Sequence, residues 1–257
     1  MQKYWILIAG LLLSTFSAQA QQSEREAERP FLTSIRAAMD ADGRAVEERE
    51  RDANRLPVET LDFLGLDETM RVVELIPGAG WYSRLLGPAL NERGKLYLAI
   101  AAGRVRESGL LDQPGYEGVE ILEPELEIVP DPETGLVAIR PFDLGVENVD
   151  AVLTFRNLHN LNAEGRASMN QAAFNALKPG GIYGVVDHTR RHMQPDDPEN
   201  RRRVDPVLMI REIQAAGFVF EDFSDLHYRL DDELRYEVGR KSVTGNTDRF
   251  TFVFKKP

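Results

Sequence analysis

The sequence predicts an α/β fold built on a mostly parallel β-sheet. From Arg71 onward, short apolar runs alternate with helix-length segments, as they do where helices connect parallel strands. The chain has 257 residues, of which 42% are hydrophobic and 28% charged. This composition is ordinary for a folded globular protein, and the length fits one full domain behind a short leading segment.

Seven apolar runs predict the strands of this sheet, at residues 71–76, 95–100, 136–140, 149–155, 181–187, 218–223 and 250–254. Helices are expected between them at residues 81–90, 164–177 and 206–216. We expect the last two strands to pair antiparallel. The segment 103–148 is rich in Pro and Gly, and a small hairpin is expected there at residues 119–122.

The first twenty residues show the three-part pattern of a secretory signal. Lys3 supplies a positive start, residues 4–13 are apolar but short for a membrane span, and Ala18 and Ala20 mark a cleavage site. We therefore expect cleavage after Ala20, a periplasmic mature protein and no stable membrane association. An uncleaved membrane anchor is the alternative. The chain has no cysteine, which excludes disulfides and a lipoprotein anchor.

We expect residues 21–55 to form a helical extension and residues 56–257 to form the main domain. The extension is rich in Glu, Arg and Ala, and Gly43 divides it into two expected helices that cover the domain. An ion pair between Asp52 and Arg55 is expected to dock the extension. A second pair, between Asp248 and Arg249, is expected within the C-terminal hairpin.

The net charge of −11 argues against a nucleic-acid partner, because phosphate binding needs clustered Lys and Arg. The same charge disfavours docking on an anionic membrane surface. We expect a small-molecule substrate.

A glycine-rich turn follows the first predicted strand. Residues 72–80 read VVELIPGAG, so a hydrophobic strand runs into a turn that opens a helix. Glycines there let the backbone come close to a ligand, and the helix start offers free N–H groups. A tight turn without a ligand is the alternative interpretation.

A second turn, residues 175–181 with the sequence NALKPGG, leads into the run at 182–187. Together the two turns resemble the class I S-adenosylmethionine-dependent methyltransferases, over roughly residues 56–256. The apolar run VDAVL at 149–153 and the turn AAGF at 215–218 also match that family. The resemblance implies a Rossmann-like seven-stranded sheet, S-adenosylmethionine as cofactor and methyl transfer to a small acceptor.

A small group of exported bacterial predicted methyltransferases is more similar still. The stretches that carry this likeness are RDANRLP at 51–57, PGAGWYS at 77–83, VVDH at 185–188 and TDRF at 247–250.

The family motif assigns cofactor-binding positions in this chain. The resemblance implies that Glu74, Pro77, Gly78 and Gly80 shape the cofactor loop, and that Tyr82 flanks it.

Two positions depart from the family pattern. Ile76 replaces the first glycine of the loop. Ile100 stands where the family ends its second strand with an acid that binds the ribose hydroxyls, and the next carboxylate is Glu107. This departure, together with export, favours an alternative function: a non-catalytic exported binding protein that has kept the fold.

Two histidines follow neighbouring predicted strands, His159 after the fourth and His188 after the fifth. Ligands of open α/β sheets bind at the carboxyl ends of strands, so His159, Asp187 and His188 are expected to converge there. We predict His188 as general base, assisted by Asp187 and His159. Hydrogen-bonding caps of the strand ends are one alternative. A metal site that adds His192 is another.

Overall fold

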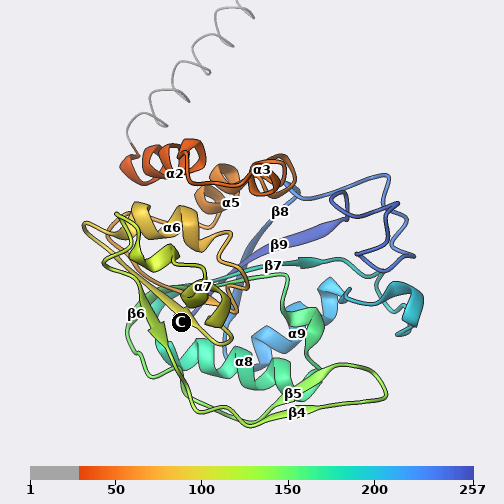
Figure 1. The fold of residues 1–257 in the computed structure, drawn as a ribbon. Helices are drawn as coiled ribbons and strands as arrows, with labels where there is room; N and C mark the ends of the chain where they lie inside the picture. Colours follow the sequence, from red (N-terminus) through yellow and green to blue (C-terminus); the bar gives the residue numbers. More distant parts are fainter. Residues whose placement is uncertain (1–28) are drawn as a thin grey trace, which may run out of the picture.

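The structure is a computed structural model in which residues 29–257 are described. The expected signal segment 1–20 and the first part of the extension lie outside the described residues. The fold is organised on a seven-stranded sheet with the order β3-β2-β1-β6-β7-β9-β8. Its strands β7, β9 and β8 lie side by side in Figure 1. Its strands are β1 Arg71–Leu75, β2 Lys95–Ala99, β3 Glu120–Leu122, β6 Val149–Phe155, β7 Leu177–His188, β8 Val219–Ser224 and β9 Arg249–Lys255.

The sheet confirms the predicted fold class. Strands β3, β2, β1, β6 and β7 are parallel to one another, while β9 runs antiparallel to both β7 and β8. The expected antiparallel pairing of the last two strands is therefore present.

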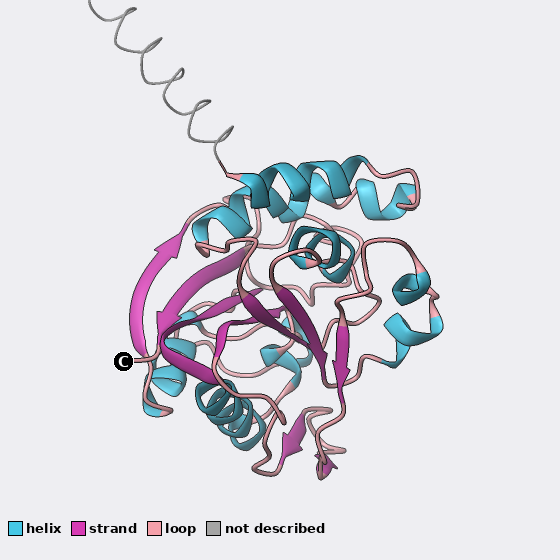
Figure 2. Cartoon of the chain, turned by 90° about the vertical axis from the view of Figure 1, so that its left-hand side faces the viewer, coloured by secondary structure: helices cyan, strands magenta, loops and turns pink. Residues whose placement is uncertain are grey.

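Helices cover both faces of the sheet (Figure 2). They are α2 Pro30–Asp40, α3 Val46–Arg49, α4 Asp52–Arg55, α5 Pro57–Phe63, α6 Ser83–Leu90, α7 Gly103–Glu107, α8 Ala163–Ala176 and α9 Pro206–Ala215. Short 3-10 turns occur at Leu110–Asp112, Leu158–Asn160 and Pro198–Asn200. Alternate residues of β1 serve the two faces: Val72 packs into the core beneath α2 and α6, and Val73 into the core beneath α8 and α9. No helix within residues 29–257 combines the length and apolarity needed to cross a membrane.

The N-terminal extension is built into the core rather than only resting on it. Helix α2 contacts α5 and α6 and buries Phe31, Leu32 and Ile35. Where one second helix was expected after Gly43, two short helices form, α3 and α4.

The segment between β2 and β6 differs from the prediction. The expected hairpin at 119–122 is β3, a parallel edge strand paired with β2. The expected third strand at 136–140 is instead β5 Val137–Ile139, which pairs with β4 Ile128–Pro130 in a separate two-stranded sheet. Ala138 and Ile139 are buried because β5 contacts α8, so their apolar pattern has a different cause from a central strand.

Both expected ion pairs of the extension and C-terminus are absent from the described residues. Asp52 accepts two hydrogen bonds from the Arg44 guanidinium, at 2.6 and 2.8 Å, instead of pairing with Arg55. Asp248 accepts from the backbone N–H of Arg229 at 2.8 Å, while the Arg249 guanidinium donates to backbone carbonyls. In each case the carboxylate forms its hydrogen bonds with a different donor, the Arg44 side chain for Asp52 and the Arg229 backbone for Asp248.

Replacement of Ile35 by Ala is expected to lower the free energy of unfolding by about 2–5 kcal/mol, because its side chain is fully buried between α2 and the domain. Urea denaturation followed by circular dichroism measures this change. Thr33→Ala, on the exposed side of α2, serves as the control and should stay within about 0.5 kcal/mol of wild type. Equal effects of the two substitutions would contradict the packing of α2.

Candidate functional site

The backbone is strained at the carboxyl ends of three adjacent strands. Ile76 after β1, Ile100 and Ala101 after β2, and Arg156 after β6 have φ angles of 52°, 66°, 53° and 64°. Positive φ is rare for residues other than glycine, and rarer for β-branched ones. Such conformations concentrate at functional sites, where the surrounding structure imposes them. The strain therefore marks this edge of the sheet.

The glycine loop has the open geometry that a ligand-binding loop requires. Gly78 and Gly80 have φ angles of 62° and 79°. A Cβ on Gly78 would meet no atom within 4 Å, whereas one on Gly80 would lie 3.1 Å from Val105 Cγ2. Ile76 keeps the left-handed backbone expected of the glycine it replaces. The loop backbone thus fits the cofactor assignment, with free space over Gly78.

Glu74 lies beneath this loop, with 3% of its surface exposed. The Ser83 hydroxyl at the start of α6 donates to its carboxylate at 2.6 Å. Burial raises the pKa of Glu74 to about 7, although the Ser83 hydrogen bond and the charge of Arg55 act in the opposite direction. Glu74 therefore connects β1 to α6 from inside the protein.

Tyr82 is buried as well, and two aromatic side chains pack against its ring. Phe155 stacks on it with ring centroids 3.7 Å apart, and Trp81 meets it edge-on. These contacts place Tyr82 in the wall behind the loop.

The end of β2 does not offer the acidic side chain of the family pattern. Ile100 is 6% exposed, and Ile76 N donates to Ala99 O at 2.8 Å, which holds the ends of β1 and β2 together. The glycine loop of this chain therefore fits the cofactor, whereas the acidic residue that usually contacts the ribose is missing.

His159 and Asp187 form a buried pair at the ends of β6 and β7. The His159 Nδ1 is hydrogen-bonded to Asp187 Oδ1, and the His159 backbone N–H donates to Oδ2 at 3.2 Å. Asp187 is fully buried, and His159 is 8% exposed. The predicted convergence of these two residues is thus present.

His188 lies beside this pair in a different environment. Its backbone N–H donates to Asp187 Oδ1 at 2.7 Å, and its Nδ1 lies 2.9 Å from Thr247 Oγ1. Its ring centroid is 5.5 Å from that of His159. Burial, followed by electrostatic interaction with His159, holds the pKa of His188 well below 6.5, so its ring is neutral at pH 7.

The fourth residue of the metal alternative lies elsewhere. His192 Nδ1 is 2.8 Å from Asp205 Oδ2, on the carboxylate that also caps α9. Within residues 29–257 no group of three or more His, Cys, Asp or Glu side chains is arranged to hold a metal ion.

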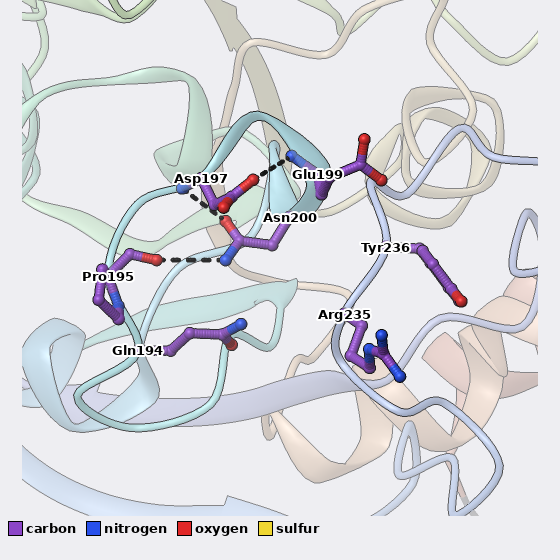
Figure 3. Close-up of a pocket in the computed structure, with 7 residues that line it drawn as sticks. All are labelled: Gln194, Pro195, Asp197, Glu199, Asn200, Arg235 and Tyr236. Carbon is purple, nitrogen blue, oxygen red and sulfur yellow. Dashed lines mark hydrogen bonds between the residues drawn. The ribbon is translucent and has the colours of Figure 1, made fainter.

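Two cavities adjoin the loop that follows β7. The larger, of about 550 Å³, is lined by His159, Asn160 and Leu161 from the end of β6, together with Arg166, Arg190 and residues 201–203. The smaller, of about 300 Å³, lies between residues 194–200 and the pair Arg235 and Tyr236 (Figure 3). Of the predicted catalytic residues, only His159 lines either cavity.

Two positioning residues were not predicted from the sequence. Asn157 Nδ2 donates to the carbonyls of Leu75 and Ile76 at 3.1 and 3.3 Å, so it joins the end of β6 to the glycine loop. Thr247 meets His188 across 59 residues of sequence. A polar residue two positions after an apolar strand was a usable signal for Asn157, whereas nothing local connects Thr247 to His188.

Comparison with known proteins places the fold. No protein-family model and no curated protein sequence matches the chain. A SAM-dependent methyltransferase from Aquifex aeolicus has a similar structure, with a TM-score of 0.53, 17% identity, and coverage of 87% of this chain and 97% of that one. The [4+2]-cyclase SpnF matches with a TM-score of 0.53, 18% identity and 85% coverage of each chain. The glycopeptide N-methyltransferase MtfA matches with a TM-score of 0.51, 15% identity, and coverage of 80% and 97%.

The chain therefore has the Rossmann-like fold of the class I S-adenosylmethionine-dependent methyltransferases. Because a cyclase has a similar structure, the reaction must be argued from the site and not from the fold.

Replacement of Glu74 by Gln is expected to change how stability depends on pH. The folded-state pKa of about 7 exceeds the ordinary 4.5, so the wild type loses stability as pH rises from 4.5 through about 7. Gln is isosteric, still accepts from Ser83 and does not titrate. Between about pH 5 and about pH 8, the free energy of unfolding of the variant should rise by up to ~3 kcal/mol relative to that of wild type. Urea denaturation at both pH values measures this difference.

Glu133→Gln, on an exposed turn, is the matched control, and its difference from wild type should stay flat over the same range. A flat difference for Glu74→Gln too would contradict the buried titration.

Proposed function

We propose that this chain is an S-adenosylmethionine-dependent methyltransferase that acts on a small acceptor, with His159 as the general base. The observation that carries the proposal is the buried His159–Asp187 pair, whose histidine lines a cavity of about 550 Å³. The fold of the structural neighbours supports the reaction class.

Asp187 determines how His159 would act. With Nδ1 committed to the carboxylate, the remaining ring nitrogen, Nε2, is the one able to accept a proton. A hydroxyl or amine acceptor must lose a proton as it is methylated, and an imidazole nitrogen facing the acceptor can take that proton. Burial holds the pKa of His188, on which the sequence prediction rested, well below 6.5, so its ring is a weak base, and its Nδ1 contacts Thr247 Oγ1. We therefore give it a positioning role next to Asp187.

The cofactor would be held at the glycine loop. Backbone groups of Pro77, Gly78 and Gly80 would approach it, with Glu74 and Tyr82 fixing the loop from behind. When bound, S-adenosylmethionine supplies an activated methyl group on its sulfonium. The ribose would be held without the usual carboxylate, because Ile100 stands at that position. We also propose that the protein is exported to the periplasm, on the signal pattern of residues 1–20.

Calorimetric titration of the chain with S-adenosylhomocysteine tests cofactor binding. We expect a micromolar site, about −8 kcal/mol. Gly78→Val should weaken it at least about tenfold, because a side chain would fill the open space over the loop and its φ is positive. Gly145→Val is the matched control, since Gly145 is equally open and has a φ of 75° away from the loop.

Absence of binding heat, together with no thermal stabilisation by millimolar ligand, would reject the methyltransferase. The alternative, a binding protein that has kept the fold, would then stand.

His159→Gln is expected to slow methyl transfer by about 10²–10⁴-fold at neutral pH while leaving S-adenosylhomocysteine affinity unchanged. The assay follows labelled methyl transfer to an acceptor found by screening hydroxyl- and amine-containing metabolites. His188→Gln removes the neighbouring imidazole and should cost much less. If His188→Gln proves the more damaging of the two, the assignment of the base to His159 is wrong.

A further inference from the structure

Three arginines gather at the edge of the sheet where β6 ends and β9 begins. Arg55 closes α4, Arg156 follows β6, and Arg249 opens β9 opposite His188. Arg55 and Arg249 are each 5% exposed, and Arg156 is half-buried. Arg51, at the start of α4, is exposed, so the cluster reaches solvent on that side.

Aromatic contacts hold Arg55 in place. Its guanidinium carbon lies 4.3 Å from the ring centroid of Trp81 and 5.6 Å from that of Tyr82. Tyr82 in turn stacks on Phe155, the residue before Arg156. The cluster therefore adjoins both the glycine loop and the end of β6.

Backbone contacts bring Arg249 to the same place. Its Nη2 donates to Asn54 O, next to Arg55, at 2.7 Å, and its Nε donates to Thr247 O at 3.2 Å. Thr247 also contacts His188, which connects the cluster to the proposed catalytic residues.

Among the described residues, the three guanidinium groups lack the carboxylate partners that buried arginines normally have. Within the described part of the chain, no carboxylate forms an ion pair with Arg55, Arg156 or Arg249. The side chains of Arg55 and Arg156 donate to no residue there, and the buried Arg55 Nε has no partner. A guanidinium has five N–H donors in a fixed plane, so the side chains of Arg55 and Arg156 keep donors that no atom in residues 29–257 accepts.

The like charges also disfavour one another. Burial, and then the charge of Arg156, lowers the pKa of Arg55 to about 8 and that of Arg249 to about 10. A guanidinium keeps its proton in proteins. The lowered pKa values therefore indicate that positive charge is unfavourable at this place. A bound anion would relieve the repulsion and accept the free hydrogen bonds at once.

We propose that Arg55, Arg156 and Arg249 form an oxyanion-binding site for the carboxylate or phosphate group of a small ligand. Planar guanidinium groups bind both kinds of oxyanion through paired hydrogen bonds. The inferred source of the group rests on the proposed function: the methyl acceptor is anionic, or the cofactor contributes its own carboxylate. The site itself rests on the arginines alone.

Thermal-shift titration of the full chain with inorganic phosphate and with succinate, in a zwitterionic low-chloride buffer, tests the site. Wild type should show saturable stabilisation by at least one of the two anions. Arg156→Gln should weaken that anion's binding about tenfold or more, since it removes charge-assisted hydrogen bonds. Arg93→Gln, at an arginine whose side chain is 61% exposed and paired with Glu68, is the control and should bind as wild type does.

A second readout separates binding from a structural role. Without anion, Arg156→Gln should melt no lower than wild type, because it removes one of three mutually repelling charges. A lower melting temperature without any change in anion response would overturn the proposal. So would stabilisation of wild type that chloride reproduces at equal ionic strength. If Arg156→Gln does not fold, Arg55→Met, which keeps an apolar stem over Trp81, replaces it in both measurements.

Two further titrations identify the source of the oxyanion. S-adenosylhomocysteine has a carboxylate, and 5′-methylthioadenosine lacks it. Weakening of the first ligand but not the second by Arg156→Gln would assign the site to the cofactor. Phosphate binding to wild type already saturated with S-adenosylhomocysteine would assign it to the acceptor. Arginine-dependent phosphate binding without any S-adenosylhomocysteine binding would reject the proposed methyl transfer and keep the oxyanion site.

Discussion

The candidate site depends on one buried carboxylate, that of Asp187. It accepts hydrogen bonds from the ring and backbone of His159 and from the backbone of His188, with none of its surface exposed. A carboxylate taken out of water is costly unless such donors surround it. The end of β7 is consequently bonded to the turn after β6, and the orientation of His159 is set by a residue on the neighbouring strand.

Hydrogen bonds from neighbouring strands also impose the conformation of the glycine loop where glycine is absent. Ile76 donates to Ala99 O, and its own carbonyl accepts from Asn157. These bonds fix the left-handed backbone that a β-branched side chain would otherwise avoid. The loop conformation is therefore determined by hydrogen bonds from the neighbouring strands, and it persists although one glycine of the motif is replaced.

Much of the fold was predictable from the sequence, because the strands at 71–76, 95–100 and 149–155 are short apolar runs bounded by clear turns. The errors lay between β2 and β6. There a three-residue edge strand leaves little pattern, and β5 is buried by α8 instead of by the main sheet. Burial alone does not say which partner causes it.

The site was predictable in part. That His159 and Asp187 would meet followed from strand order, because adjacent parallel strands end at the same edge. The different surroundings of His159 and His188 did not follow, since they depend on Thr247 and on cavity walls distant in sequence. The predicted ion pair between Asp52 and Arg55 was wrong although the two residues are near neighbours in sequence. Asp52 instead accepts from Arg44, and the Arg55 side chain packs on the Trp81 ring.

The antiparallel direction of β9 has a consequence for the order in which the site is assembled. Because β9 enters the sheet at the edge where β7 leaves it, Thr247 and Arg249 stand beside His188. A chain synthesised from its N-terminus has made the glycine loop, His159 and Asp187 long before these residues. The candidate site is therefore completed by a segment made after its other parts, and a growing chain holds an unfinished site until that strand inserts.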